Sequence, residues 1–396
     1  MSALAGIRVL DLGTFIAGPH CATILGEFGA EVIKVEPPKT GDSLRRLGTN
    51  TDCGDTLVWL SEARNKKCVT LDLGSERGRK LLRQLAAKCD IIVENFRPGT
   101  LEKWGLGYDE LKQINRGAIL VRISAYGQDG PMRAQPGFAR IAHAFSGLTY
   151  LAGEPGGVPV VPGSTSLADY MSGMYGAIGA LVALRARETT GEGQCIDLAL
   201  YESVFRVLDE IAPAFQKFGY VRERMGADTV NVCPHSHYQT KDGKWVAIAC
   251  TSDQMFARLA EAMGRPDFAS AERYGPKDLR LAAREEVNAI VGNWVASLDC
   301  EAVLKLCATG GVPASLIYSI EDIFRDPQYR ARGNIQMKDS RAGTIAVPDV
   351  VPRLSETPGE IRWLGAGLGA QNHEVYGKLL GLGPDEIDDL RRNGII

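Results

Sequence analysis

Hydrophobic and polar positions alternate in short blocks over the first 125 residues, and these blocks predict a repeated order of strand and helix. Short segments that we expect to be strands occupy 7–12, 31–36, 69–73, 90–94 and 118–124. Helical periodicity separates them at 19–28 and 76–89, where Leu81, Leu82 and Leu85 fall on one face. Strands that alternate with helices indicate an α/β fold with a doubly wound parallel sheet. Ligands bind such sheets beyond the carboxyl ends of the strands.

The pattern changes after residue 125. Residues 137–217 are expected to be mainly helical, with a long apolar helix at 170–187 and a strand at 195–201. A hairpin at 238–249 turns at Asp242-Gly243 and precedes expected helices at 253–263, 276–298 and 300–308 and a strand at 313–318. We therefore divide the chain into the first part of a large Rossmann-like domain (1–219), a smaller α+β domain (220–330) and a return segment (331–396) that completes the large domain. The return segment ends in expected helices at 371–380 and 384–393.

Composition narrows the function classes. The chain has 396 residues, a net charge of −3 and a pI near 6.1, so no basic field indicates nucleic acid or an anionic membrane. We find no signal peptide and no apolar run of about 18 residues, and we expect a protein without a membrane segment. The nine cysteines are scattered without a C-x-x-C pair, which predicts free thiols in the cytoplasm. His235 and His237 lack further ligands nearby, so we expect no metal site.

Asp169 is the most informative single residue. It is a lone carboxylate where a Gly/Ser/Thr-rich loop meets the long apolar helix. One interpretation is a structural helix cap, and the run by itself favours this one. The other is an anion favoured by the helix N-terminus, which could act as a nucleophile toward an activated acyl group.

Polar groups gather at three predicted strand ends. The turn at 13–19 offers a helix N-terminus for an anion, and Asn95, Phe96 and Arg97 combine an amide, a ring and a cation. Lys34, Arg45 and the run 64–67 could bind phosphates, although each group also fits an ordinary loop. There is no G-x-S-x-G elbow and no Walker loop, so α/β-hydrolases and P-loop NTPases lose their main support.

Ordered blocks over nearly the whole chain carry a family resemblance. They include Ala17-Gly-Pro19, Val93-Glu-Asn-Phe-Arg-Pro-Gly99 and Ser124-Ala-Tyr-Gly-Gln-Asp-Gly-Pro131, together with 6–12, 25–36, 64–67, 105–108, 144–147, 310–314, 326–328 and 354–359. The chain resembles the class III CoA-transferases, the family that also contains the α-methylacyl-CoA racemases.

The resemblance implies chemistry, ligands and assembly. Asp169 takes the position of the family's catalytic nucleophile and would form covalent aspartyl intermediates. The substrates would be an acyl-CoA thioester and small carboxylic acids, with no tightly bound cofactor, and the large domain would bind CoA. Positions that match CoA contacts of the family are Phe15, Ile16, Ala17, Asn95, Phe96, Arg97 and Lys103. The family also implies a homodimer whose two chains interlock.

Two departures bear on the substrate. Phe138 stands where racemases carry a histidine base, which weakens the alternative of an acyl-CoA racemase or epimerase. Arg140 stands beside a position where relatives often carry an acid, so it either clamps the distal carboxylate of a dicarboxylic substrate or is a surface cation. The leading interpretation is CoA transfer to a small, dicarboxylic acid. A CoA-binding protein without catalysis is a third class, and the acid pair stays open.

Overall fold

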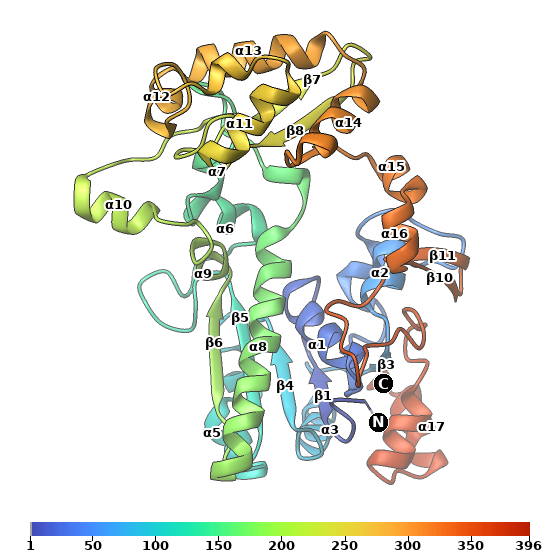
Figure 1. Ribbon diagram of the computed structural model, residues 1–396. Coiled ribbons are helices and arrows are strands. Elements are labelled where there is room, and N and C mark those ends of the chain that lie inside the picture. Colours follow the sequence, from blue (N-terminus) through green and yellow to red (C-terminus); the bar gives the residue numbers. More distant parts are fainter. Residues whose placement is uncertain (1) are drawn as a thin grey trace. The chain divides into compact units, whose positions relative to one another are not determined.

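Six parallel strands form the central sheet in the order β3-β2-β1-β4-β5-β6. The computed structural model describes residues 2–396 (Figure 1). The strands are β1 (Arg8–Asp11), β2 (Glu31–Glu36), β3 (Lys66–Thr70), β4 (Ile91–Glu94), β5 (Ile119–Ser124) and β6 (Cys195–Ala199). The mixed α/β class predicted from the pattern is confirmed. The strand order reverses between the neighbouring strands β1 and β4. In open α/β sheets, ligands bind at such a switch point, beyond the carboxyl ends of the strands.

Helices cover both faces of the sheet. Successive side chains of each strand point to opposite faces, so each face contributes residues that pack against helices. Val9 and Val32 pack on one face with α1 (Ala17–Glu27), α8 (Leu167–Thr190) and α9 (Leu200–Phe205). Leu10 and Ile33 pack on the other with α3 (Glu76–Ala86), α5 (Tyr108–Ile114), α17 (Pro384–Arg392) and the π-helix His373–Leu379. This two-residue period is what a strand buried on both faces requires.

The remaining elements are short or belong to a second compact unit. The short helices are α2 (Leu57–Glu62), α4 (Thr100–Lys103), α6 (Ala139–Phe145), α7 (Leu148–Leu151), α10 (Ile211–Phe218), α15 (Ile320–Arg325) and α16 (Pro327–Arg332), with 3₁₀ turns at Ser43–Arg46, Pro162–Ser164 and Pro266–Ala269. A three-stranded antiparallel sheet contains β7 (His235–Gln239), β8 (Trp245–Ala249) and β9 (Ala314–Leu316). It packs with α11 (Asp253–Ala262), α13 (Arg284–Ala296) and α14 (Cys300–Gly310), near α12 (Lys277–Ala282). A hairpin of β10 (Ile335–Ser340) and β11 (Gly343–Pro348) lies in the return segment.

The chain passes from one compact unit to the other and back. The first unit contains the chain up to Thr149, Val161–Gln216 and Ala331–Ile396, and the second contains Tyr150–Val160 and Lys217–Arg330. Residues 150–160, which our division left in the large domain, cluster with the second unit. The Tyr150 hydroxyl donates to Glu223 at 2.6 Å, and Arg224 donates to the Tyr150 carbonyl at 2.7 Å.

Several expected elements have other bounds in the structure, and three of these differences are informative. The strand expected at 69–73 is β3, Lys66–Thr70, because ion pairs let the two lysines enter the sheet. The helix expected at 276–298 is two helices, α12 and α13, which meet at Ala283. The helix expected at 170–187 begins earlier and ends later, as α8, Leu167–Thr190.

Helix α8 also corrects the statement that no apolar run is long enough for a membrane. Among residues 2–396 it is long and apolar enough to cross one by length and composition alone. The core helix of a soluble protein passes the same test, and one face of α8 is buried. Gly173 faces α1, where an added Cβ would lie 3.0 Å from the Ala17 carbonyl oxygen. Small residues on α8 therefore let the two helices approach closely.

Candidate active site

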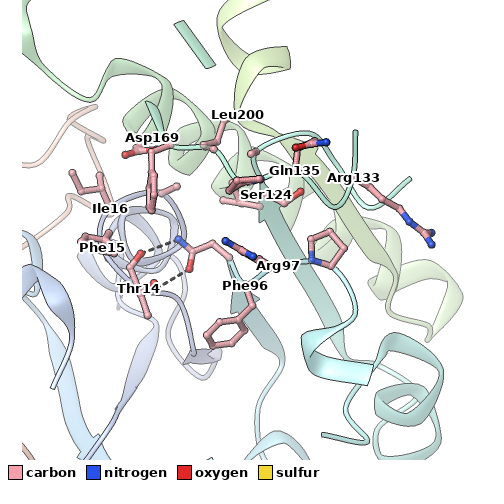
Figure 2. A pocket seen from close by; sticks show the side chains of 18 residues that line it. Thr14, Phe15, Ile16, Phe96, Arg97, Ser124, Arg133, Gln135, Asp169 and Leu200 are labelled. Carbon is pink, nitrogen blue, oxygen red and sulfur yellow. Dashed lines mark hydrogen bonds between the residues drawn. The ribbon is translucent and has the colours of Figure 1, made fainter. Parts of the chain in front are cut away.

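A cavity of about 270 Å³ opens at the switch point of the sheet (Figure 2). The loops that follow β1, β4 and β5 form most of its wall, and the first turns of α8 and α9 contribute Asp169 and Leu200. The complete lining is Thr14, Phe15, Ile16, Ala17, Asn95, Phe96, Arg97, Pro98, Ile123, Ser124, Ala125, Arg133, Gln135, Pro136, Gly137, Phe138, Asp169 and Leu200. All of these residues belong to the first unit.

Two loops are joined across the switch point by a reciprocal pair of hydrogen bonds. The Thr14 backbone N–H donates to the Asn95 side-chain carbonyl at 2.7 Å, and the Asn95 amide donates to the Thr14 carbonyl at 2.8 Å (Figure 2). The loops after β1 and β4 are thereby held at a fixed spacing. Gly13 permits the tight turn, because a Cβ there would lie 2.7 Å from Cδ of Pro19.

Phe15 is held in a left-handed backbone conformation, with φ of 60°. Such a conformation is strained for a residue with a side chain, and surrounding contacts must maintain it. The Phe15 N–H donates to Asp42 at 3.1 Å, and Asp42 pairs with the buried ammonium of Lys34 at 2.9 Å. Lys34 also donates to the Gly13 carbonyl, so one ion pair supports both sides of the turn.

This network corrects the expectation that strand-end cations bind phosphate. Four of them are buried and paired with carboxylates: Lys34 with Asp42, Arg45 with Glu36, Arg64 with Glu27 and Lys66 with Asp11. Burial of a cation is costly unless a partner compensates, and here each partner is internal. These cations therefore stabilise the turns around the cavity.

Asp169 does not cap its helix. It is the third residue of α8, the N-cap is Ser166, and no side chain of the cap accepts a hydrogen bond from the first turn. Within residues 2–396 the Asp169 carboxylate has no hydrogen-bond donor or ion-pair partner. Burial raises the pKa of Asp169 to about 6. A carboxylate with a raised pKa on a cavity wall, without a partner, is a candidate for a functional role.

Most predicted contact residues meet in this cavity. Phe15, Ile16, Ala17, Asn95, Phe96 and Arg97 line it, as does Phe138, whose ring stacks edge-on against Phe15 with 5.9 Å between centroids. Lys103 ends α4 as an exposed side chain outside the lining. Arg140 is exposed on α6 and is also outside it, so a role in substrate binding stays a prediction.

Sequence reasoning missed Ser124, Arg133, Gln135 and Leu200 in the wall. Ser124 ends β5, and Arg133 and Gln135 follow in the same loop, so their place after a strand end was the available signal. Figure 2 shows Arg97 extending among the lining residues, whereas Arg133 extends away from Asp169. Arg97 forms no ion pair within the part of the chain that the structure describes.

A second cavity of about 260 Å³ shares Thr14 and Phe96 with the first. Leu71, Leu73, Trp104, Pro37 and Pro38 supply much of its apolar wall. Phe96 and Trp104 stack edge-on, 5.1 Å between centroids. The two cavities therefore offer adjoining spaces, the first with the Asp169 carboxylate and the second with a mainly apolar wall that also includes Glu36 and Asp72. Within residues 2–396, no three His, Cys, Asp or Glu side chains lie close enough to hold a metal ion.

Comparison with known proteins agrees with this geometry. Residues 4–372 match the model of CoA-transferase family III. The chain belongs to this family. It is 55% identical over 396 residues to the succinyl-CoA–L-malate CoA-transferase beta subunit of Chloroflexus aurantiacus, covering 99% of this chain and 98% of that one. It is 54% identical over 395 residues to the alpha subunit from the same organism, covering 99% of this chain and 92% of that one.

A solved structure supports the same conclusion. A CAIB/BAIF family protein from Brucella suis superposes with a TM-score of 0.84 at 31% identity, covering 96% of this chain and 99% of that chain. The resemblance to class III CoA-transferases is confirmed, and the chain is an enzyme of that class. Its substrates are accordingly an acyl-CoA and a carboxylic acid.

Proposed function

We propose that this family III CoA-transferase moves CoA from succinyl-CoA, or a closely similar thioester, to a small dicarboxylic acid through covalent intermediates on Asp169. The observation that carries this proposal is the unpartnered, partly buried carboxylate of Asp169 on the cavity wall. Desolvation makes a carboxylate a stronger nucleophile than it is in water, since fewer hydrogen bonds must be broken before attack.

The transfer consists of four acyl-transfer steps and needs no oxidant or reductant. A carboxylate oxygen of Asp169 attacks the thioester carbonyl, and the C–S bond breaks to give a mixed anhydride and CoA thiolate. The thiolate attacks the aspartyl carbonyl, which releases the first acid and leaves an aspartyl-CoA thioester. The acceptor carboxylate attacks that thioester and expels the thiolate, forming a second anhydride. The thiolate then attacks the acceptor carbonyl, and the Asp169 carboxylate is regenerated.

The two adjoining cavities suit the two ends of a CoA thioester. The reacting carbonyl would lie beside Asp169, and the nucleotide would lie against the apolar wall that contains Trp104. Arg97 would bind a phosphate, because its guanidinium has no ion-pair partner among the residues that the structure describes. Ala17 and Gly18 begin α1, and first-turn N–H groups have no carbonyl partner within a helix, so they can stabilise an oxyanion. No tightly bound cofactor is needed for these steps.

Support for a dicarboxylic acid comes from the Chloroflexus relatives, whose names specify succinyl-CoA and L-malate. Incubation with succinyl-CoA and a panel of free acids, followed by mass spectrometry of the new thioesters, tests the substrate class. Hydroxylamine added during turnover should convert an aspartyl thioester into a hydroxamate, detectable in the peptide that contains Asp169. Malate-like acids should be preferred, and a hydroxamate on any other residue would contradict the assignment of the nucleophile.

The racemase alternative makes a different prediction. Phe138 lines the cavity where a racemase needs a base, and its ring cannot accept a proton. We expect no deuterium at the α-carbon of a chiral 2-methylacyl-CoA after incubation in heavy water. Rapid incorporation would favour racemisation.

We also propose a cytoplasmic, interlocked homodimer. Support comes from the first unit, which the chain leaves and re-enters, and from Met174, Ile178, Leu181 and Val182, which are exposed apolar residues of α8. A large exposed apolar face is typical of an oligomer interface. Light scattering of the chain expressed alone should give twice the monomer mass with activity. A chain that is active only with a second, related subunit would contradict a homodimer.

A further inference from the structure

His143 contacts the backbone next to the proposed nucleophile. It lies on α6 with only 1% of its surface exposed. Its Nε2 accepts a hydrogen bond from the backbone N–H of Ala168 at 3.0 Å. Ala168 is itself fully buried and directly precedes Asp169. The mechanism proposed above makes no use of this side chain.

The contact replaces a missing helix cap. The N–H of the second helical residue is normally taken by the side chain of the N-cap. In α8 that N-cap is Ser166, which makes no such bond, and Ala168 is the second residue. A side chain from a different helix therefore satisfies the N–H group. This ties the first turn of α8 to α6.

The hydrogen bond also fixes the charge state of the ring. Nε2 can accept only when it carries no proton, so the neutral ring must hold its proton on Nδ1. Burial lowers the pKa of His143, and the nearby charge of Arg140 lowers it further. Both effects keep the acceptor available at neutral pH.

A histidine side chain at position 143 costs stability if it only fills space in the core. Its Nδ1–H is buried and has no hydrogen-bond partner within residues 2–396. An unsatisfied buried donor opposes folding, and an apolar side chain of similar size would avoid that cost. A histidine at this place is explained by the acceptor that it supplies to Ala168.

The opposite side of the same turn is also packed. The ring of Tyr170 stacks edge-on against His20, 4.9 Å between centroids, and His20 pairs with Glu62 at 3.1 Å. The turn that carries Asp169 is thus held from α6 on one side and from α1 and α2 on the other. Only the α6 contact is a hydrogen bond to the backbone of the turn itself.

We propose that His143 is a positioning residue, which orients the Asp169 carboxylate for attack by holding the Ala168 N–H. This inference rests on the covalent role proposed for Asp169. A misplacement of about 1 Å can lower a rate about 100-fold, so loss of the acceptor should reduce kcat more than substrate affinity.

The experiment compares His143→Leu with His143→Gln in the full-length enzyme. Leucine removes the acceptor, and kcat should fall about 10- to 100-fold while KM stays within about threefold. Glutamine keeps a neutral acceptor oxygen and should restore kcat to within about threefold of the parent. Formation of the aspartyl-CoA adduct, followed by rapid quench and intact-mass analysis, should slow in parallel with kcat. If His143→Leu does not fold, His143→Asn replaces it, since the shorter amide falls short of Ala168.

Ser203→Ala is the matched control. It removes another buried hydrogen bond to α8, between Ser203 and Ser172 at 2.9 Å, away from the first turn. This variant should keep kcat within about twofold of the parent if position at the first turn is what matters. Unchanged kcat in His143→Leu, equal losses in the leucine and glutamine variants, or an equal loss in Ser203→Ala would overturn the inference. Normal transfer by Asp169→Asn would instead overturn the covalent function on which it rests.

Discussion

Asp42 and Asp169 both bear on the first cavity, yet their surroundings are opposite. Asp42 is buried outside the lining and holds the lining residue Phe15, whereas Asp169 is partly buried in the cavity wall itself. Asp42 accepts hydrogen bonds from the N–H groups of Leu44 at 2.8 Å and Phe15 at 3.1 Å, and it pairs with Lys34 at 2.9 Å. Burial alone would raise its pKa, but Lys34 and these N–H groups lower it below the ordinary value. Asp169 has burial without compensation, and its pKa rises to about 6.

The difference separates a structural carboxylate, Asp42, from the carboxylate that we propose as the nucleophile, Asp169. The Asp42 anion is committed to the turn that holds Phe15. The Asp169 anion is left to whatever enters the cavity, since no protein group within residues 2–396 satisfies it. The same substitution to asparagine at each residue tests this difference, because the two variants should have opposite effects on stability.

The largest expected effect is on turnover in Asp169→Asn. The amide cannot form an anhydride, so CoA transfer should fall by about 10³-fold or more, with no substitute nucleophile in the loop. The thermal midpoint should not fall, because an unpaired buried charge is removed. Assays with succinyl-CoA and calorimetry measure both quantities. Near-parent turnover would remove Asp169 from the mechanism.

Asp42→Asn should show the reverse pattern of stability. It leaves the Lys34 ammonium buried with a weakened partner, and the breaking of such a pair costs about 3–5 kcal/mol of unfolding free energy. Denaturant unfolding of the two asparagine variants, measured side by side, tests this. A loss in Asp42→Asn no greater than that in Asp169→Asn would contradict the contrast between the two carboxylates.

The pH dependence of stability and of kcat/KM should reveal the raised pKa of Asp169. The pKa of Asp169 is raised from 3.8 to about 6 in the folded state, so the charged form opposes folding by about 3 kcal/mol at neutral pH. The parent should therefore gain stability relative to Asp169→Asn as pH falls from about 6 to about 4. Over the same range kcat/KM for the acyl-CoA should decline as the nucleophile is protonated. A stability difference that does not change with pH would contradict the raised pKa.

The smallest expected effect concerns the cation Arg140. Lys34 is buried and paired with Asp42, whereas Arg140 is exposed on α6. An exposed guanidinium pairs weakly, so Arg140→Met should lower kcat/KM for a dicarboxylic acyl-CoA by only about fivefold, with little change for a monocarboxylic one. The ratio of the two specificity constants is the measurement. Equal losses for both substrates would make Arg140 a surface cation.

Local pattern was sufficient for much of the fold. The segments 31–36 and 118–124 predicted β2 and β5 nearly to the residue, because both are rich in Val and Ile, which favour strands, even though β2 also contains charged residues. The charged run 64–67 concealed the start of β3, since Lys66 is buried against Asp11, 55 positions earlier, and the Pro19 carbonyl. An ion pair between residues this far apart in the sequence cannot be seen in the local pattern of hydrophobic and polar residues.

The sequence by itself determined the alternation of strands and helices, the family and the identity of Asp169 as the candidate nucleophile. Each of these follows from residue types and order along the chain. Only the tertiary structure decided that Lys34, Arg45 and Lys66 are internal and that Asp169 is without a partner. It also brought Arg133 and Gln135 into the cavity wall and set His143 against Ala168. Burial and pairing depend on residues that are distant in sequence, and these properties determine whether a charged group stabilises the protein or reacts.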